Sequence, residues 1–171
     1  MELAGMVRDV PDFPVKGILF KDITTLIRDA DAFREVIEWM TGQYADKDID
    51  CVVAVEARGY IFGAPLAYKL GAGFVPVRKP GKLPAETISE SYALEYGANT
   101  LEMHADAIQP GQRVVVVDDL LATGGSAKAA INLVERLGGT VAGIAFMIEL
   151  DFLHGREKLE GYQVISLIHY A

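Results

Sequence analysis

Apolar residues recur along the chain in two patterns, short unbroken runs and helical spacings. The unbroken runs have the length of strands, and we predict strands at residues 51–55, 74–77, 113–117, 141–148 and 164–168. Apolar positions at helical spacing predict helices at residues 32–44 and 63–70 and after Ser126, the last of them ending at Gly138. Pro65 is then expected in the first turn of its helix, where proline is tolerated.

The order of these elements predicts the fold class. Strands that alternate with helices favour a mostly parallel central sheet with helices on both faces, the α/β class. Strands buried on both faces need not alternate apolar with polar residues, which agrees with the uniformly apolar runs. No linker divides the chain, so we expect one domain over residues 1–171, with an N-terminal segment (1–30) and a polar, Gly- and Pro-containing stretch (79–98) that forms a flexible loop or a weak hairpin.

Composition and charge exclude several classes of protein. Sixteen Lys and Arg against 24 Asp and Glu give a net charge of −8, which argues against general nucleic-acid binding. The apolar runs are too short to cross a bilayer, and the N-terminus lacks the basic start and long apolar stretch of a secretory signal. The single cysteine, Cys51, is expected to be a buried core residue in a reducing compartment, so we expect a cytoplasmic enzyme.

The stretch Val114–Ser126 carries the clearest chemical signal. Four valines predict a strand inside the sheet, and the sequence turns polar where that strand should end, at the edge where open α/β sheets bind ligands. A small glycine-containing turn then leads into a helix. Its backbone N–H groups, the helix dipole and two hydroxyls suit a phosphate monoester, and the residues concerned are Ala122, Thr123, Gly124, Gly125 and Ser126.

Asp118 and Asp119 add an acceptor pair beside this phosphate site. Two neighbouring carboxylates can each accept a hydrogen bond from one hydroxyl of a cis-diol, and a diol near a phosphate describes ribose 5-phosphate. The alternative is that one Asp only caps the helix. A nucleotide triphosphatase is excluded because no G-x-x-x-x-G-K-[ST] loop occurs, and the G-x-G-x-x-G dinucleotide motif is absent too.

With these residues in view, the chain resembles the type I phosphoribosyltransferases, whose signature is an apolar strand, paired acids and a Thr-Gly-Gly-type loop. Four more blocks are similar to the adenine phosphoribosyltransferase family and occur in its order: residues 12–24, 56–63, 78–84 and 91–97. The resemblance implies transfer of the 5-phosphoribosyl group from 5-phosphoribosyl 1-diphosphate to adenine, giving AMP and diphosphate in purine salvage. It also implies a homodimer, and a base-covering hood formed by residues 1–30.

The blocks also suggest individual roles. Arg58 follows the strand that ends at Val55, so it should lie at the same sheet edge as the Asp pair and bind a diphosphate. Arg78, Lys79 and Lys82 form a basic cluster that would hold the same anion, although a surface turn and a solvated charge run are the plainer alternatives.

The block at residues 91–97 is expected to form a lid over the reacting groups. A closing lid would exclude water while positive charge develops on the sugar. Glu95 is the candidate for taking the proton that adenine loses, and Tyr92 and Tyr96 are expected to pack the closed lid. The alternative for Glu95 is an ordinary exposed residue on a hairpin.

The hood and the metal are assigned through the resemblance. It implies that backbone groups near Leu19 and Lys21 read the adenine edge, with Ile18 and Phe20 as apolar cover, although Phe20 would also suit a plain core. The three histidines show no metal-ligand spacing, and we expect Mg²⁺ to arrive on the diphosphate of the substrate, with few protein ligands.

Two other functions share the ribose-phosphate loop. A 6-oxopurine phosphoribosyltransferase would differ in the hood and lid. A regulatory protein that binds 5-phosphoribosyl 1-diphosphate and controls transcription would need a DNA-reading element, and none fits before Asp12. Arg58 and Glu95 favour catalysis over regulation.

Overall fold

The computed structural model describes residues 1–94 and 96–171, which form two compact units, Met1–Trp39 and Met40–Ala171. The first unit contains η1 (Ala4–Met6), β1 (Arg8–Pro11), β2 (Leu19–Asp22) and α1 (Thr24–Ile27). β1 and β2 pair antiparallel, with oppositely charged residues directly across from each other: Arg8 bonds Asp22 and Lys21 bonds Asp9, each at 2.6 Å. Helix α2 (Ala30–Tyr44) begins in this unit and ends in the second.

The second unit is built on a five-stranded sheet in which all neighbouring strands are parallel. Its strand order is β4-β3-β7-β8-β9. The strands are β3 (Cys51–Val55), β4 (Gly73–Val77), β7 (Arg113–Leu121), β8 (Thr140–Leu150) and β9 (Val164–Tyr170). The predicted parallel α/β sheet is confirmed, and every predicted strand is present.

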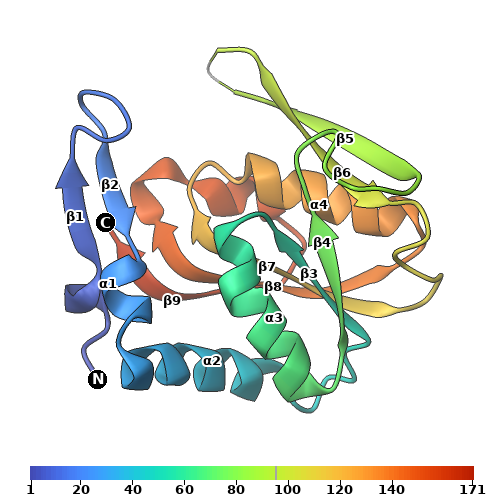
Figure 1. Ribbon diagram of the computed structural model, residues 1–171, viewed down its shortest axis with the longest axis horizontal. Coiled ribbons are helices and arrows are strands. Elements are labelled where there is room, and N and C mark those ends of the chain that lie inside the picture. The colour runs from blue at the N-terminus through green and yellow to red at the C-terminus, as the bar shows by residue number, and fades with distance from the viewer. Residues whose placement is uncertain (95) are drawn as a thin grey trace. The chain divides into compact units, whose positions relative to one another are not determined.

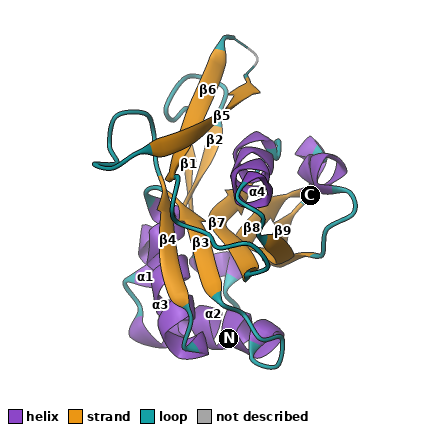
Figure 2. Ribbon diagram, turned by 90° about the vertical axis from the view of Figure 1, so that its right-hand side faces the viewer, coloured by secondary structure: helices purple, strands orange, loops and turns teal. Residues whose placement is uncertain are grey.

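Two helices of this unit, α3 (Arg58–Leu70) and α4 (Gly125–Arg136), lie on opposite faces of the sheet (Figure 2). Alternate residues of the apolar strand β3 pack toward the two different helices. Val53 and Val55 belong to the buried cluster that includes the apolar residues of α4, whereas Val52 and Ala54 lie under Gly63 of α3. Cys51 is buried as predicted, and burial raises the pKa of its thiol to about 11.

The expectation for Pro65 was wrong. Helix α3 begins at Arg58 rather than at residue 63, so Pro65 lies in the helix interior. Proline there removes one helical hydrogen bond, which disfavours the helix locally. Phe62 and Leu66 on either side of it are fully buried, and this tertiary burial outweighs the local preference.

The stretch predicted as a flexible loop or weak hairpin contains a strand, β5 (Thr87–Ala93), which pairs antiparallel with β6 (Ala98–His104). This hairpin extends past the sheet beside α4 (Figure 1). Arg136 of α4 holds it, because its Nη1 donates to the Ser89 carbonyl at 2.6 Å and lies 3.2 Å from the Glu90 carboxylate. The hairpin is therefore fastened to the helix near its base.

Two short 3-10 helices, η2 (Asp151–Leu153) and η3 (Gly155–Leu159), connect β8 to β9. Among the helices of residues 1–94 and 96–171, none has both the length and the apolar character needed to cross a membrane.

Close packing of α3 on β3 gives a stability prediction. A Cβ at Gly63 would lie 2.7 Å from the Ala54 Cβ and 3.3 Å from the Phe74 ring, so the helix must shift to admit it. Gly63→Ala should lower the free energy of unfolding by about 1–3 kcal/mol, measured by urea titration. Gly42→Ala in α2 is the matched control, since open space surrounds Gly42 and the change should stabilise by about 0.5–1 kcal/mol. Equal effects at the two positions would contradict the packing argument.

Candidate active site

Chemical groups converge at the carboxyl ends of β4, β3 and β7, which are neighbours in the sheet. Arg78 follows β4, Glu56 and Arg58 follow β3, and Asp118 and Asp119 lie within the last part of β7. Strand β7 continues to Leu121, four residues beyond the predicted end. Both aspartates are therefore held by the sheet ladder and not by a loop.

Asp119 and Arg58 join two of these strand ends. Arg58 Nε donates to Asp119 Oδ2 at 2.6 Å, and the carboxylate is buried while the arginine side chain is half exposed. The predicted placement of Arg58 beside the Asp pair is thus what the structure has. One side of this arginine faces the carboxylate, and its exposure makes it accessible to a further anion.

Asp118 is about as buried as its neighbour, and the positive charge that acts on it is that of Arg58, which is bonded to Asp119. Its Oδ1 accepts a hydrogen bond from the Asp119 N–H at 2.8 Å and lies close to Gly59, where a Cβ would come within 3.1 Å of it. Burial raises the pKa of Asp118 well above its ordinary value, and the nearby Asp119 carboxylate raises it further. In the ligand-free protein Asp118 therefore retains its proton to a higher pH than an ordinary aspartate does.

The turn after β7 has the shape of an anion site. Gly124 has φ +88°, a backbone conformation that favours glycine, and α4 begins at Gly125 with its first N–H groups available for a ligand. A cavity of about 180 Å³ lies at this turn, lined by Tyr92, Leu94, Leu120, Leu121, Ala122, Thr123, Gly124, Gly125, Ser126, Ala127 and Phe146. The five residues predicted to bind phosphate all line it. Gly125 and Ser126 lie in the first turn of the helix.

Both glycines are required by close neighbours. A Cβ on Gly125 would lie 2.7 Å from the ring of Tyr92, and one on Gly124 would lie 2.6 Å from the Gly155 carbonyl oxygen. The turn is thus enclosed by the β5–β6 hairpin on one side and by the β8–β9 connection on the other. The turn cannot open without displacing the hairpin or the connection.

Glu56 is a site residue that sequence reasoning did not single out. Its carboxylate accepts a hydrogen bond from the Lys79 N–H at 2.7 Å and lies 3.4 Å from Arg78 and 3.9 Å from Lys82. Burial opposes its ionisation, but these hydrogen bonds and positive charges outweigh burial and leave the pKa of Glu56 below its ordinary value. An acid directly after a buried strand was the available signal.

The predicted basic cluster is therefore arranged around a carboxylate. The backbone of Arg78 also pairs with Glu102 of β6, and the Gly81 N–H donates to the Glu102 side chain at 2.8 Å. These bonds fasten the start of the stretch 79–98 to the hairpin. Lys79 and Lys82 have exposed side chains next to it.

The lid residues have different positions. Tyr92 lines the cavity at the glycine turn, whereas Tyr96 lies between β5 and β6 and is 86% exposed. Glu95, the candidate for proton transfer, lies outside the described residues.

Leu19, Phe20 and Lys21 of the predicted hood lie on β2 in the first unit, and Ile18 directly precedes this strand. Phe20 meets Phe13 edge to face at 5.1 Å, and both line an apolar cavity of about 260 Å³ with Val10, Asp22 and Thr24. Leu19 is 52% exposed, and Lys21 is paired with Asp9. Phe20 thus borders a cavity and is not part of a closed core.

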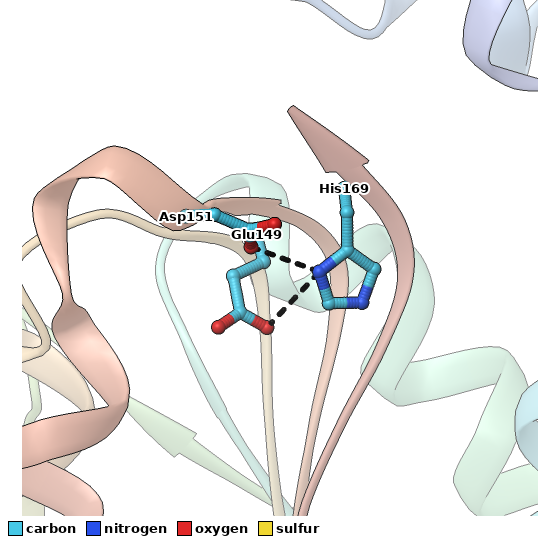
Figure 3. A group of neighbouring side chains, drawn as sticks. All are labelled: Glu149, Asp151 and His169. Carbon is cyan, nitrogen blue, oxygen red and sulfur yellow. Dashed lines mark hydrogen bonds and ion pairs between the residues drawn. The ribbon is translucent and has the colours of Figure 1, made fainter. Parts of the chain in front are cut away.

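The structure also contains a cluster of two acidic residues and one histidine that the sequence did not predict. Glu149, Asp151 and His169 place one donor atom each within 4.8 Å of one another (Figure 3). Glu149 and His169 are register partners on β8 and β9, a pairing that no local sequence spacing reveals. In the part of the chain that the structure describes, this is the one such group of three, and it includes neither Asp118 nor Asp119.

Comparisons with known proteins agree with this geometry. The family model described as phosphoribosyl transferase domain matches residues 22–168. The adenine phosphoribosyltransferase of Alkaliphilus metalliredigens is 60% identical over 170 residues, covering 99% of this chain and all of the relative, and that of Halothermothrix orenii is 60% identical over 168 residues, covering 98% and 99%.

Solved structures of the same kind superpose closely. The crystal structure of adenine phosphoribosyltransferase from Thermoanaerobacter pseudethanolicus has a TM-score of 0.96 at 59% identity, covering 99% of this chain and 98% of that one. The Saccharomyces cerevisiae enzyme, complexed with an imino-altritol bisphosphate and adenine, has a TM-score of 0.91 at 43% identity, covering 97% and 96%.

The burial of Asp118 predicts a pH-dependent stability. A carboxyl group with a raised pKa in the folded state stabilises most when protonated, so its contribution falls as pH rises from the ordinary value near 3.8 to the raised value. The Asp118→Asn side chain cannot ionise. As the pH increases across that window, the free energy of unfolding of this variant should therefore rise relative to that of the wild type, by at most about 1.4 kcal/mol per pH unit. Urea unfolding without ligands, repeated from pH 4 to 8, measures it. A constant difference between the two proteins would show that Asp118 does not titrate in this way.

Proposed function

This chain belongs to the phosphoribosyl transferase domain family, and we propose that it transfers the 5-phosphoribosyl group of 5-phosphoribosyl 1-diphosphate to adenine, giving AMP and diphosphate. The observation that carries this proposal is that one strand end combines the buried Asp118–Asp119 pair with the glycine turn and its cavity of about 180 Å³. Full-length relatives at 60% identity named adenine phosphoribosyltransferase support the choice of base.

The ribose phosphate is assigned to β7 and the turn after it. The carboxylates of Asp118 and Asp119 accept hydrogen bonds from the two ribose hydroxyls, and the N–H groups and hydroxyls of residues 122–126 bind the 5-phosphate. Arg58 fixes the orientation of Asp119 through Oδ2, at 2.6 Å. The sugar is then held at both ends by one continuous piece of backbone.

The diphosphate is assigned to the neighbouring strand ends. Arg58 and the cluster of Arg78, Lys79 and Lys82 supply positive charge, and Glu56 keeps that cluster together. As the bond between the sugar C1 and the diphosphate oxygen breaks, these groups stabilise the charge that develops on the leaving group.

Mg²⁺ fits this site as an ion carried by the substrate. Its preferred ligands are oxygens, and it keeps few protein ligands when phosphates are present. Asp118 and Asp119 offer carboxylate oxygens at this edge, while no three-ligand group of His, Cys, Asp and Glu occurs here among the described residues. When bound, the ion neutralises part of the charge of the diphosphate.

Adenine is assigned to the predicted hood residues. Leu19 and Lys21 present backbone groups to the base, with Phe20 and Ile18 as apolar cover. The ring nitrogen of adenine forms a bond to the sugar C1 as the diphosphate leaves. Adenine loses one proton overall, and we assign Glu95 as the group that accepts this proton. Tyr92 and Tyr96 pack the lid that excludes water. The structure in complex with adenine from Saccharomyces cerevisiae supports a base site in proteins of this kind.

A homodimer and a cytoplasmic location complete the proposal. One substrate of this reaction, 5-phosphoribosyl 1-diphosphate, is a phosphorylated metabolite, and the lone, buried Cys51 suits a reducing compartment.

An assay of the purified protein with Mg²⁺, 5-phosphoribosyl 1-diphosphate and each purine base in turn tests the function. Adenine should be consumed with release of AMP and diphosphate, and hypoxanthine and guanine should react at least 100-fold less efficiently, because their donor and acceptor pattern is reversed at one ring edge. Turnover of a 6-oxopurine with adenine inert would identify the other branch of the family. Binding of 5-phosphoribosyl 1-diphosphate without turnover of any base would favour a regulatory protein.

Glu95→Gln tests the proton-transfer assignment. The amide keeps the size of the side chain but cannot take a proton, so kcat should fall about 100-fold or more while the affinity for 5-phosphoribosyl 1-diphosphate changes little. Steady-state kinetics and direct titration of the variant measure the two quantities. Glu86→Gln, an exposed residue directly before β5, is the control for a lost charge and should keep its kcat. Wild-type turnover in the Glu95 variant would remove this residue from the chemistry.

A further inference from the structure

The β8–β9 connection supports the phosphate-binding turn directly. We call residues 151–159 the supporting segment. A Cβ on Gly155 would overlap the carbonyl oxygen of Ala122 and would lie 2.8 Å from the Leu121 side chain. A Cβ on Gly124 would lie 2.6 Å from the Gly155 carbonyl oxygen. The two backbones are therefore in van der Waals contact, and any shift of the supporting segment is transmitted to the turn.

An ion pair next to Gly155 fixes the position of this segment. Arg156 Nε donates to both carboxylate oxygens of Glu149, at 2.7 and 3.0 Å, and its Nη1 donates to the Val164 carbonyl at 2.9 Å. Ser166 Oγ donates to Glu149 Oε2 at 2.6 Å. Glu149 is 4% exposed and Arg156 about half exposed, so a buried carboxylate on β8 anchors the segment to the sheet.

A cation site is the competing explanation, since Glu149, Asp151 and His169 lie close together (Figure 3) and all three line a surface hollow. Both oxygens of Glu149 already accept hydrogen bonds from Arg156, and Ser166 donates to one of them. A metal ion there would also lie next to the Arg156 guanidinium. The carboxylate serves the arginine, and His169 completes the group by bonding Asp151 at 2.9 Å.

We propose that Glu149 and Arg156 are positioning residues for the 5-phosphate of the substrate. Neither touches the substrate. Their ion pair presses Gly155 against Ala122 and Gly124 and so holds the N–H groups of the turn in their binding geometry. This inference rests on the proposed function, because it assigns the turn to the phosphate of a phosphorylated ribose.

Titration with ribose 5-phosphate tests the proposal without any need for turnover. Glu149→Gln keeps the shape of the side chain but removes its charge, and Arg156→Gln removes the other half of the pair. Each should raise the Kd for ribose 5-phosphate at least tenfold by calorimetry at 15 °C. In kinetics, KM for 5-phosphoribosyl 1-diphosphate should rise similarly, with kcat and the KM for adenine within twofold of wild type.

Controls separate positioning from folding. Arg34→Gln breaks an exposed arginine–aspartate pair, with Asp31 at 2.7 Å in α2, and should leave the affinity unchanged. Ser166→Ala keeps both charges and provides the milder test should a charge variant fail to fold; it should weaken binding about threefold. Folded variants that bind ribose 5-phosphate within twofold of wild type would overturn the proposal even if their Tm has fallen, because the pair would then only stabilise the fold.

Failure of this inference and failure of the proposed function give different results. A wild-type protein that binds ribose 5-phosphate but does not convert adenine would refute the function alone, and the comparison of variants would still decide the positioning role. A wild-type protein that does not bind ribose 5-phosphate would overturn the positioning role.

Discussion

The burial of two adjacent carboxylates at the end of a parallel strand is the constraint around which the second unit is arranged. Charged groups are costly to bury unless they are paired or protonated. Here Asp119 is paired with Arg58 of the next strand end, and Asp118, whose pKa is raised by burial, accepts a hydrogen bond from the Asp119 N–H. These groups lie at the carboxyl edge of the sheet, which is also the edge where we propose that the ligand binds.

Glu56, which directly follows β3, is also largely buried, but its surroundings favour the ionised form. Its largely buried carboxylate is surrounded by Arg78, Lys82 and the Lys79 N–H, which keep it ionised. Positive charge is thereby collected next to Arg58 in a chain whose net charge is −8. An acidic protein can hold a diphosphate only where such local arrangements reverse the sign of the field.

The phosphate turn derives its shape from its neighbours as much as from its own residues. Tyr92 of the hairpin abuts Gly125, and Gly155 of the β8–β9 connection abuts Gly124. The hairpin is held by Arg136, and the connection by Glu149 and Arg156. The rigid elements that enclose a loop set its binding geometry, and for this reason we propose that an ion pair distant from the ligand influences the site.

The sequence by itself determined the parallel α/β fold, the strand that ends in paired acids, the glycine turn and the placement of Arg58 beside the pair. These follow from local patterns, since apolar runs, turn glycines and the rule that parallel strands end at one edge need no knowledge of distant contacts. The tertiary structure decided that Pro65 lies inside α3, that the acids belong to the strand, and that Glu56 organises the basic residues. It alone joined Glu149 to Arg156 and Gly155 to Gly124. Packing and strand register set these relations between distant segments, and neither is encoded in the spacing of neighbouring residues.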